Sequence, residues 1–109
     1  MIRSLRILLA LSLAGAAASA FADITVGVNL STTGPAASLG IPEKNTIALL
    51  PTSIGGQKVN YIVLDDATDP TAASKNARKL VSEDKVDVII GGTITPSSSA
   101  VLEVAAETK

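Results

Sequence analysis

The sequence predicts an α/β fold: a three-layer, open parallel sheet with helices on its faces and the element order β-α-β-α-β-α. Three short runs rich in β-branched residues alternate with segments whose apolar residues recur at helical spacing. This alternation is typical of parallel strands that are joined by right-handed crossovers through helices. We expect one sheet in which the strands lie in the spatial order 2-1-3.

The expected strands are residues 24–30, 58–64 and 86–90. The first two read ITVGVNL and KVNYIVL. The third, VDVII, is apolar almost throughout, which favours a strand that is covered on both faces. The Ile-Gly-Gly segment at residues 54–56 is expected to form the turn before the second strand.

Helices are expected at residues 39–50, at residues 70–84 and from Pro96 onwards. The first has the weakest pattern, with three possible inward positions at Ile41, Ala48 and Leu49. The second has the clearest pattern, a single stripe of period 3.6 formed by Ala73, Ala77, Leu80 and Val81.

Residues 1–22 have the pattern of a cleavable signal peptide. Two arginines open the chain, residues 7–18 are apolar, and Ala20 and Ala22 have the spacing that signal peptidase reads. The apolar run is shorter than the roughly 20 residues that a membrane-spanning helix needs. We therefore expect cleavage before Asp23 and a periplasmic location.

The composition of residues 23–109 argues against several classes of function. Without the two arginines of the leader, seven basic residues stand against ten acidic ones, and this mildly acidic balance argues against a nucleic-acid partner. The chain has no histidine, which removes the commonest general base and the commonest metal ligand. It has no cysteine, so an oxidising compartment is neither exploited nor contradicted. We expect no metal and no cofactor. Because residues 23–109 are a thin basis for a core and the last helical pattern has no stop signal, we expect a fragment of a longer protein.

Three loops follow the carboxyl ends of the expected strands, the edge where open parallel sheets bind ligands. They are residues 31–40, 65–69 and 91–99. The first is small and polar, and it serves either as a pocket wall or as a plain connector. The second contains Asp65, Asp66 and Asp69. A divalent-cation site or a phosphate-accepting aspartate is conceivable there, but we favour turn formation, with Asp69 as N-cap and Pro70 as the first helical residue.

The third loop, GGTITPSSSA, leads into the last helix. Thr95 is expected as the N-cap and Pro96 in the first turn, so that the N–H groups of Ser97 and Ser98 point out of the helix start. Such a start attracts anions, and the Thr95 and Ser97 hydroxyls can add donors. Two interpretations stay open here, an anion site or capping alone. A serine nucleophile is disfavoured because no histidine is present to activate it.

Four segments together resemble the periplasmic substrate-binding proteins of branched-chain amino acid ABC transporters, which have the type I periplasmic binding protein fold. They are ITVGV after the exported start, TGPAASLG, LDDATDP and DVIIGGTITPSSSAV. The resemblance covers the whole segment from residue 23 to residue 109. It implies two lobes that close on a ligand, of which this chain holds only the first part of lobe 1 and lacks the second lobe.

The resemblance also implies which residues bind the ligand. Thr95, Pro96 and Ser97 correspond to the loop that holds the carboxylate and ammonium of an amino acid, while Leu39 and Gly40 line the pocket. The implied function is a non-enzymatic receptor that delivers a small amino acid or carboxylate to a membrane permease. A ligand-sensing domain of the same fold is the alternative, and a secreted hydrolase that uses the serines of residues 97–99 is a third. By itself the fragment is expected to bind weakly or not at all.

Overall fold

A computed structural model describes residues 21–108 of the chain. Residues 1–20, and with them nearly all of the expected signal peptide, lie outside the described residues. Within residues 21–108, no helix combines the length and the apolar character that crossing a membrane requires.

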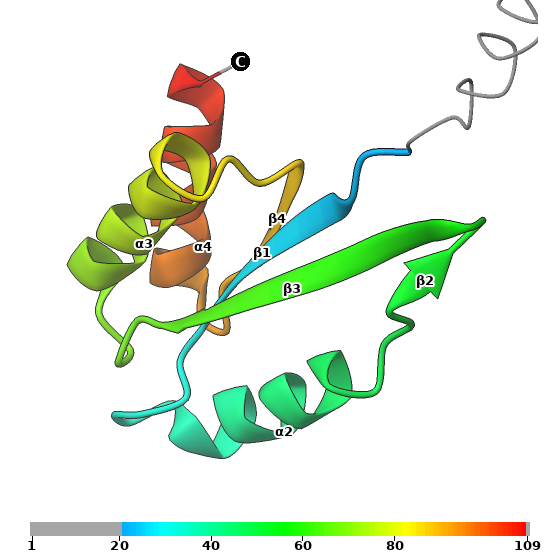
Figure 1. The fold of residues 1–109 in the computed structure, drawn as a ribbon. Coiled ribbons are helices and arrows are strands. Elements are labelled where there is room, and N and C mark those ends of the chain that lie inside the picture. Colours follow the sequence, from blue (N-terminus) through cyan, green and yellow to red (C-terminus); the bar gives the residue numbers. More distant parts are fainter. Residues whose placement is uncertain (1–20, 109) are drawn as a thin grey trace, which may run out of the picture.

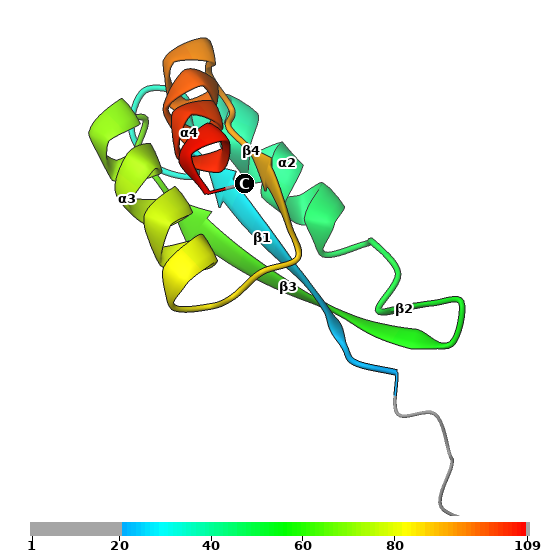
Figure 2. The same ribbon diagram turned by 90° about the horizontal axis from the view of Figure 1, so that it is seen from above.

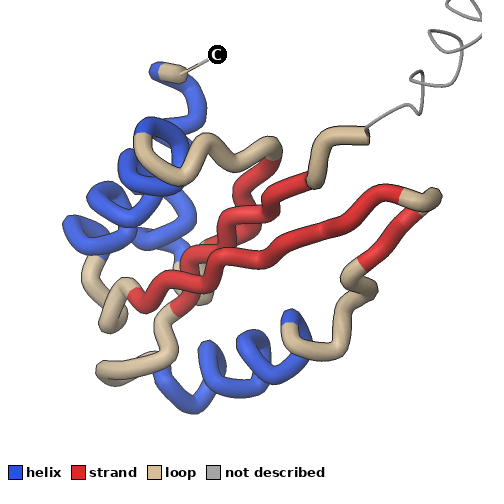
Figure 3. Tube along the Cα trace, viewed as in Figure 1, coloured by secondary structure: helices blue, strands red, loops and turns tan. Residues whose placement is uncertain are grey.

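The described residues form three layers, with a sheet between one helix and a pair of helices (Figures 1 and 2). Figure 3 shows how strands and helices alternate along the chain. The elements in chain order are β1 (Ile24–Leu30), α2 (Ala37–Ile47), β2 (Ser53–Ile54), β3 (Gln57–Asp65), α3 (Pro70–Ser82), β4 (Val88–Gly91) and α4 (Thr95–Glu107). The expected α/β class and element order are confirmed, with one short strand added.

The four-stranded sheet has the order β2-β3-β1-β4. β1 pairs in parallel with β3 on one side and with β4 on the other, so the expected order 2-1-3 of the three predicted strands is confirmed. The registers place Leu30 opposite Asp65 and Asn29 opposite Gly91. The three strands therefore end at the same edge of the sheet, and the loops that follow them meet there.

The short strand β2 was not expected from the sequence. It pairs antiparallel with the start of β3, which makes the sheet mixed instead of purely parallel. Gly55 and Gly56 connect the two strands with φ values of 58° and 80°, a left-handed pair that suits a two-residue hairpin turn and that favours glycine. The expected turn at residues 54–56 is thus part of a β-hairpin.

Alternate residues of β1 build the core on the α2 side of the sheet. Val26, Val28 and Leu30 are buried together with Val59 of β3. Ile47, at the end of α2, packs against this cluster. A period of two places these side chains on one face, as the sequence of β1 predicts.

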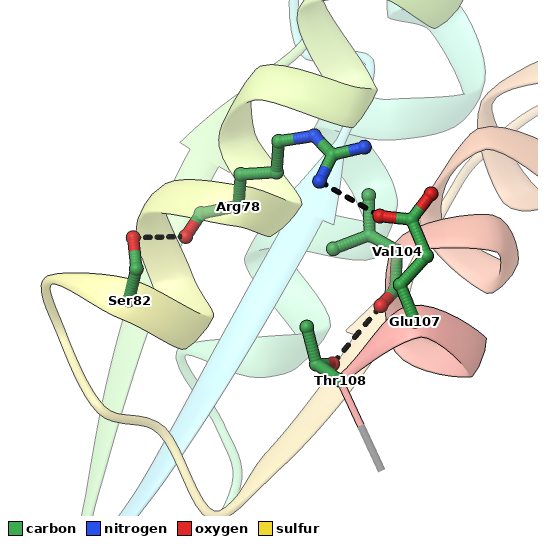
Figure 4. Close-up of polar contacts among 5 residues, drawn as sticks. All are labelled: Arg78, Ser82, Val104, Glu107 and Thr108. Atoms are coloured by element: carbon green, nitrogen blue, oxygen red, sulfur yellow. Dashed lines mark hydrogen bonds and ion pairs between the residues drawn. The ribbon is translucent and has the colours of Figure 1, made fainter.

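The opposite face of the sheet is covered by α3 and α4, which lie side by side in both views (Figures 1 and 2). The expected stripe of α3 is confirmed, with Ala73, Ala77 and Leu80 buried. The two alanines allow α4 to approach and pack against Val101 and Val104. On the surface, Arg78 Nη1 lies 2.8 Å from Glu107 Oε2 (Figure 4), an exposed ion pair that the surrounding water screens.

The orientation of α2 differs from the expected one. The helix spans Ala37–Ile47 instead of residues 39–50, and the expected inward residues Ile41, Ala48 and Leu49 are all exposed. The reason is the packing of Gly40, whose missing side chain lets the helix lie directly on the chain at Ser31. Once Gly40 faces inward, a helix of 3.6 residues per turn brings Ile47 to the same face.

The last strand is shorter and less covered than expected. β4 spans Val88–Gly91 instead of residues 86–90, and Val88 and Ile90 are 49% and 43% exposed. The expectation that both of its faces are covered is therefore wrong for the described residues. The single helix on this side leaves a groove of about 450 Å³ that runs along α2 beside Ile90.

Candidate functional site

Hydrogen bonds tie together the three loops at the carboxyl edge of the sheet. The Ser31 N–H donates to Thr93 Oγ1 at 2.9 Å, which joins the loop after β1 to the loop after β4. The Thr32 N–H donates to Asp65 Oδ1 at 2.9 Å, which joins the loop after β1 to the end of β3. The three loops predicted to form the site thus lie next to one another.

Asp66 is the buried centre of this edge. Its carboxylate is fully buried and accepts hydrogen bonds from Ser31 Oγ at 2.7 Å, from Asn29 Nδ2 at 2.9 Å and from the Thr68 N–H at 2.9 Å. Asn29 Oδ1 in turn accepts a bond from Asn76 Nδ2 of α3 at 2.8 Å. A buried charge requires such partners, so Asp66 organises the loops and has no face open to a ligand.

Asp65 is exposed, and its carboxylate binds the loop after β1 on the surface of the protein. It accepts hydrogen bonds from Thr33 Oγ1 and from the N–H groups of Thr32, Thr33 and Ala67. Desolvation raises the pKa of Asp65, but the hydrogen bonds from Thr33, Ala67 and Thr32 outweigh it and lower the pKa from 3.8 to about 2. The charged form of Asp65 is therefore the form that the folded loop selects.

This pKa predicts a measurable loss of stability in acid. Because the pKa of Asp65 is lower in the folded chain, its contribution is complete above pH 3.8 and disappears as the pH falls towards 2. We expect the variant Asp65→Asn to lose less of its free energy of unfolding between pH 4 and pH 2 than the unsubstituted chain. Urea unfolding at several pH values measures the difference, and parallel curves for the two proteins would contradict the assignment.

Asp69 and Pro70 begin α3. Asp69 Oδ1 accepts a hydrogen bond from the Thr71 N–H at 2.9 Å, which is the geometry of an N-cap, and Pro70 is the first helical residue. Among residues 21–108, no group of three or more His, Cys, Asp or Glu side chains is placed to hold a metal ion. The Asp69 bond is that of a helix cap, as expected, whereas Asp65 and Asp66 combine local turn bonds with bonds to β1 and the loop that follows it.

The start of α4 differs in detail from the expected one. Thr95 is the first helical residue, Ile94 is the N-cap, and no side chain caps the helix, so the expectation of a Thr95 cap is wrong. The helix begins one residue earlier because the N–H and hydroxyl of Ser98 both donate to the Ile94 carbonyl. The N–H of Ser98 is thus used within the helix. Those of Thr95 and Ser97 precede the first helical bond, where a helix leaves its N–H groups without internal acceptors.

The side chains at this start point in different directions. Thr95 and Pro96 are exposed. Ser97 is fully buried, and its Oγ is the one buried side-chain polar atom in the described part of the chain without a hydrogen-bond partner. Its Cβ lies so near Gly92 that a Cβ added to Gly92 would be 2.9 Å away. The Ser97 hydroxyl therefore faces the interior, whereas its N–H belongs to the helix start.

The two other predicted ligand residues lie at the start of α2. Leu39 is 56% exposed, whereas Gly40 is buried. A Cβ on Gly40 would lie 2.0 Å from the Ser31 carbonyl oxygen, so this glycine sets the distance between α2 and the loop after β1. Leu39 is the member of the pair that presents a side chain to solvent.

Sequence reasoning missed two residues that link this edge, Glu43 and Thr93. Thr93 Oγ1 donates to Glu43 Oε2 at 2.6 Å, across 50 positions of the chain. Glu43 is half-buried and lines the groove beside β4 together with Gly91 and Gly92. Neither residue is part of a recognisable sequence motif. A contact between residues so far apart in the chain produces no pattern in the sequence around either of them.

The candidate site lies at a sheet edge and includes the start of a helix. Comparison with protein families identifies the family to which the chain belongs. Residues 23–109 match the family model described as periplasmic binding protein. The chain belongs to the periplasmic binding protein family. Its members are binding receptors. No curated protein matches the chain.

Solved periplasmic binding proteins share the fold of this chain. An extracellular ligand-binding receptor from Rhodopseudomonas palustris HaA2 is 53% identical with a TM-score of 0.78, over 80% of this chain and 24% of that one. A solute-binding protein of an ABC transporter from Rhodopseudomonas palustris BisB5, in complex with 3,4-dihydroxybenzoic acid, is 34% identical with a TM-score of 0.74, over 78% and 24%. A leucine-binding protein from Thermotoga maritima is 27% identical with a TM-score of 0.70, over 78% and 25%. The chain thus spans about a quarter of the length of these proteins.

Proposed function

We propose that the chain is the first part of an exported solute-binding receptor of an ABC importer. In this proposal residues 1–22 are removed before Asp23 and the receptor acts in the periplasm. It binds a small amino acid or another small carboxylate and delivers it to a membrane permease. The ligand's carboxylate binds at the start of α4.

The observation that carries this proposal is the N-terminus of α4 at the carboxyl edge of the sheet, where Thr95 and Pro96 are exposed and Ser97 is buried. The N–H groups of Thr95 and Ser97 lie ahead of the first helical hydrogen bond, with Pro96 between them. A helix of 13 residues concentrates partial positive charge at this end, so a carboxylate is favoured there. In this proposal the exposed Leu39 at the start of α2 supplies a wall of the pocket, and the buried Gly40 holds α2 against the loop after β1.

The related structures support a carboxylate as the common recognised group. The Rhodopseudomonas palustris BisB5 protein holds 3,4-dihydroxybenzoic acid, and the Thermotoga maritima protein is a leucine-binding protein. These two molecules differ in ring, chain and amino group, but each carries a carboxylate. A helix start that binds this group leaves the choice of ligand to the remainder of the pocket.

Binding is tested in a hybrid receptor, in which residues 23–108 replace the matching segment of the Rhodopseudomonas palustris HaA2 receptor. This hybrid supplies the part of the relatives that the chain does not span. We expect a small carboxylate, with 3,4-dihydroxybenzoate and leucine as the first probes, to raise its melting temperature with increasing concentration. A cooperatively melting hybrid that responds to no member of an amino acid and carboxylate panel would contradict the proposal. The chain alone is the control, and we expect it to bind weakly or not at all.

Two substitutions in the hybrid distinguish the contributions of the Thr95 and Ser97 side chains to ligand affinity. The Thr95 side chain is exposed there, so Thr95→Ala should weaken carboxylate binding by about 1–3 kcal/mol through loss of a hydroxyl donor. Ser97→Ala removes a buried hydroxyl without a partner, so it should leave affinity nearly unchanged. Isothermal titration calorimetry measures both. Equal affinities for Thr95→Ala and the parent would leave only the main-chain N–H groups in the proposal.

A further inference from the structure

A chain of hydrogen bonds joins α2 to the two loops at the proposed site. Thr93 Oγ1 donates to Glu43 Oε2 at 2.6 Å and accepts from the Ser31 N–H at 2.9 Å. A hydroxyl has one proton, a carboxylate only accepts and an N–H only donates, so both directions are determined by chemistry. The Thr93 hydroxyl therefore donates its only proton to Glu43 and cannot donate a hydrogen bond to a ligand.

The segments joined in this way are the ones that carry the proposed ligand residues. Thr93 lies two positions before Thr95, the first residue of α4. Glu43 lies one turn after Gly40 in α2. The bond to Glu43 is charge-assisted and so is stronger than a bond between neutral groups. A single hydroxyl thus joins the segment before α4 to α2 and to the loop after β1.

We propose that Thr93 and Glu43 are positioning residues for the ligand site: neither contacts the ligand, and together they hold the start of α4 against the loop after β1. This inference rests on the proposed function for its effect on affinity. The effect on the loops themselves follows from the hydrogen bonds and is measured without ligand.

Four variants of the hybrid receptor test the proposal. Thr93→Val removes donor and acceptor, while Thr93→Ser keeps the hydroxyl. Glu43→Gln keeps an acceptor for Thr93 without the charge. Asp87→Ala is the matched control, because Asp87 Oδ2 accepts the Thr25 N–H at 2.8 Å, a bond of the same kind at the opposite end of β1.

The first readout is hydrogen exchange of the Ser31 amide without ligand. We expect exchange to be about tenfold faster or more in Thr93→Val, and close to the parent's rate in Thr93→Ser and Asp87→Ala. An unchanged rate in Thr93→Val would overturn the proposal, whether or not any ligand binds. The same exchange measurement applies to the 109-residue chain when its amides exchange slowly enough to be followed.

The second readout is the affinity of the hybrid for 3,4-dihydroxybenzoate. We expect Thr93→Val to bind at least about tenfold more weakly, and Thr93→Ser and Glu43→Gln to stay within about threefold of the parent. Asp87→Ala should bind as the parent does. An equal loss in Asp87→Ala would show a general effect of stability and would overturn the positioning role. If the parent hybrid binds no carboxylate, the proposed function fails, and the exchange of the Ser31 amide still decides whether Thr93 holds the loops.

Discussion

Asp66→Ala is expected to destabilise the fold by about 3–5 kcal/mol, a large part of the 5–15 kcal/mol that is typical of a domain. The substitution removes the acceptor of two buried donors, Asn29 Nδ2 and Ser31 Oγ, and of the partly buried Thr68 N–H. All three belong to the segments that form the carboxyl edge of the sheet. Urea unfolding should show a midpoint about 2 M lower, since small proteins lose about 1–3 kcal/mol per molar urea.

Asp69→Asn is the control for this substitution. Asp69 accepts one bond from the Thr71 N–H, and asparagine is as good an N-cap as aspartate. Its midpoint should therefore stay close to the parent's. Asp66→Asn should fall between the two, because its new amide group would face the amide of Asn29. Equal midpoints for Asp66→Ala and Asp69→Asn would refute the role given to the buried carboxylate.

Gly40→Ala is expected to destabilise the chain by about 3 kcal/mol, against the usual effect of alanine in a helix. Helix propensity alone predicts a gain of about 1 kcal/mol for this change. The new Cβ, however, would lie 2.0 Å from the Ser31 carbonyl oxygen and 2.4 Å from its carbon, and these backbone atoms cannot rotate away. Either α2 moves outward or the loop after β1 is displaced, and both disturb the core.

Asn45→Ala in the same helix is the matched control. Asn45 is exposed, so alanine there should change stability by less than about 0.7 kcal/mol, and in the stabilising direction. Thermal unfolding of the two variants beside the parent decides the matter. A Gly40→Ala variant that is more stable than the parent would show that propensity prevails and that the contact with Ser31 relaxes easily.

The elements with strong local patterns were predictable from the sequence. β1 matches its expected bounds, residues 24–30, and α3 begins at Pro70 with its expected stripe buried. Each of these segments combines a clear periodicity with flanking turn or cap residues. The alternation of strands and helices then predicts a parallel sheet with right-handed crossovers.

The orientation of α2 was not predictable in the same way. Its apolar residues form no stripe, and the helix is oriented by Gly40, a residue with no side chain to reveal which face is buried. The start of α4 was misplaced by one residue because the carbonyl of Ile94, and not that of Thr95, accepts the first helical hydrogen bond, which the Ser98 N–H donates. Both errors concern contacts of the main chain, which sequence patterns record poorly.

The meeting of the three loops was predictable from the sequence, but the hydrogen-bond network that joins them was not. The rule that ligands bind beyond the carboxyl ends of parallel strands placed it at three loops, and these loops are in contact. The links that hold them, Asn29 to Asp66 and Thr93 to Glu43, join residues 37 and 50 positions apart. Single residues of ordinary type at such separations carry no signal until the fold brings them together.

A crystal structure of the hybrid receptor with 3,4-dihydroxybenzoate tests the central claim most directly. The account predicts that a carboxylate oxygen lies about 3 Å from the main-chain nitrogen of Thr95 or of Ser97, within hydrogen-bonding distance of the start of α4. A bound ligand whose carboxylate lies elsewhere, with water at the start of this helix, would contradict it.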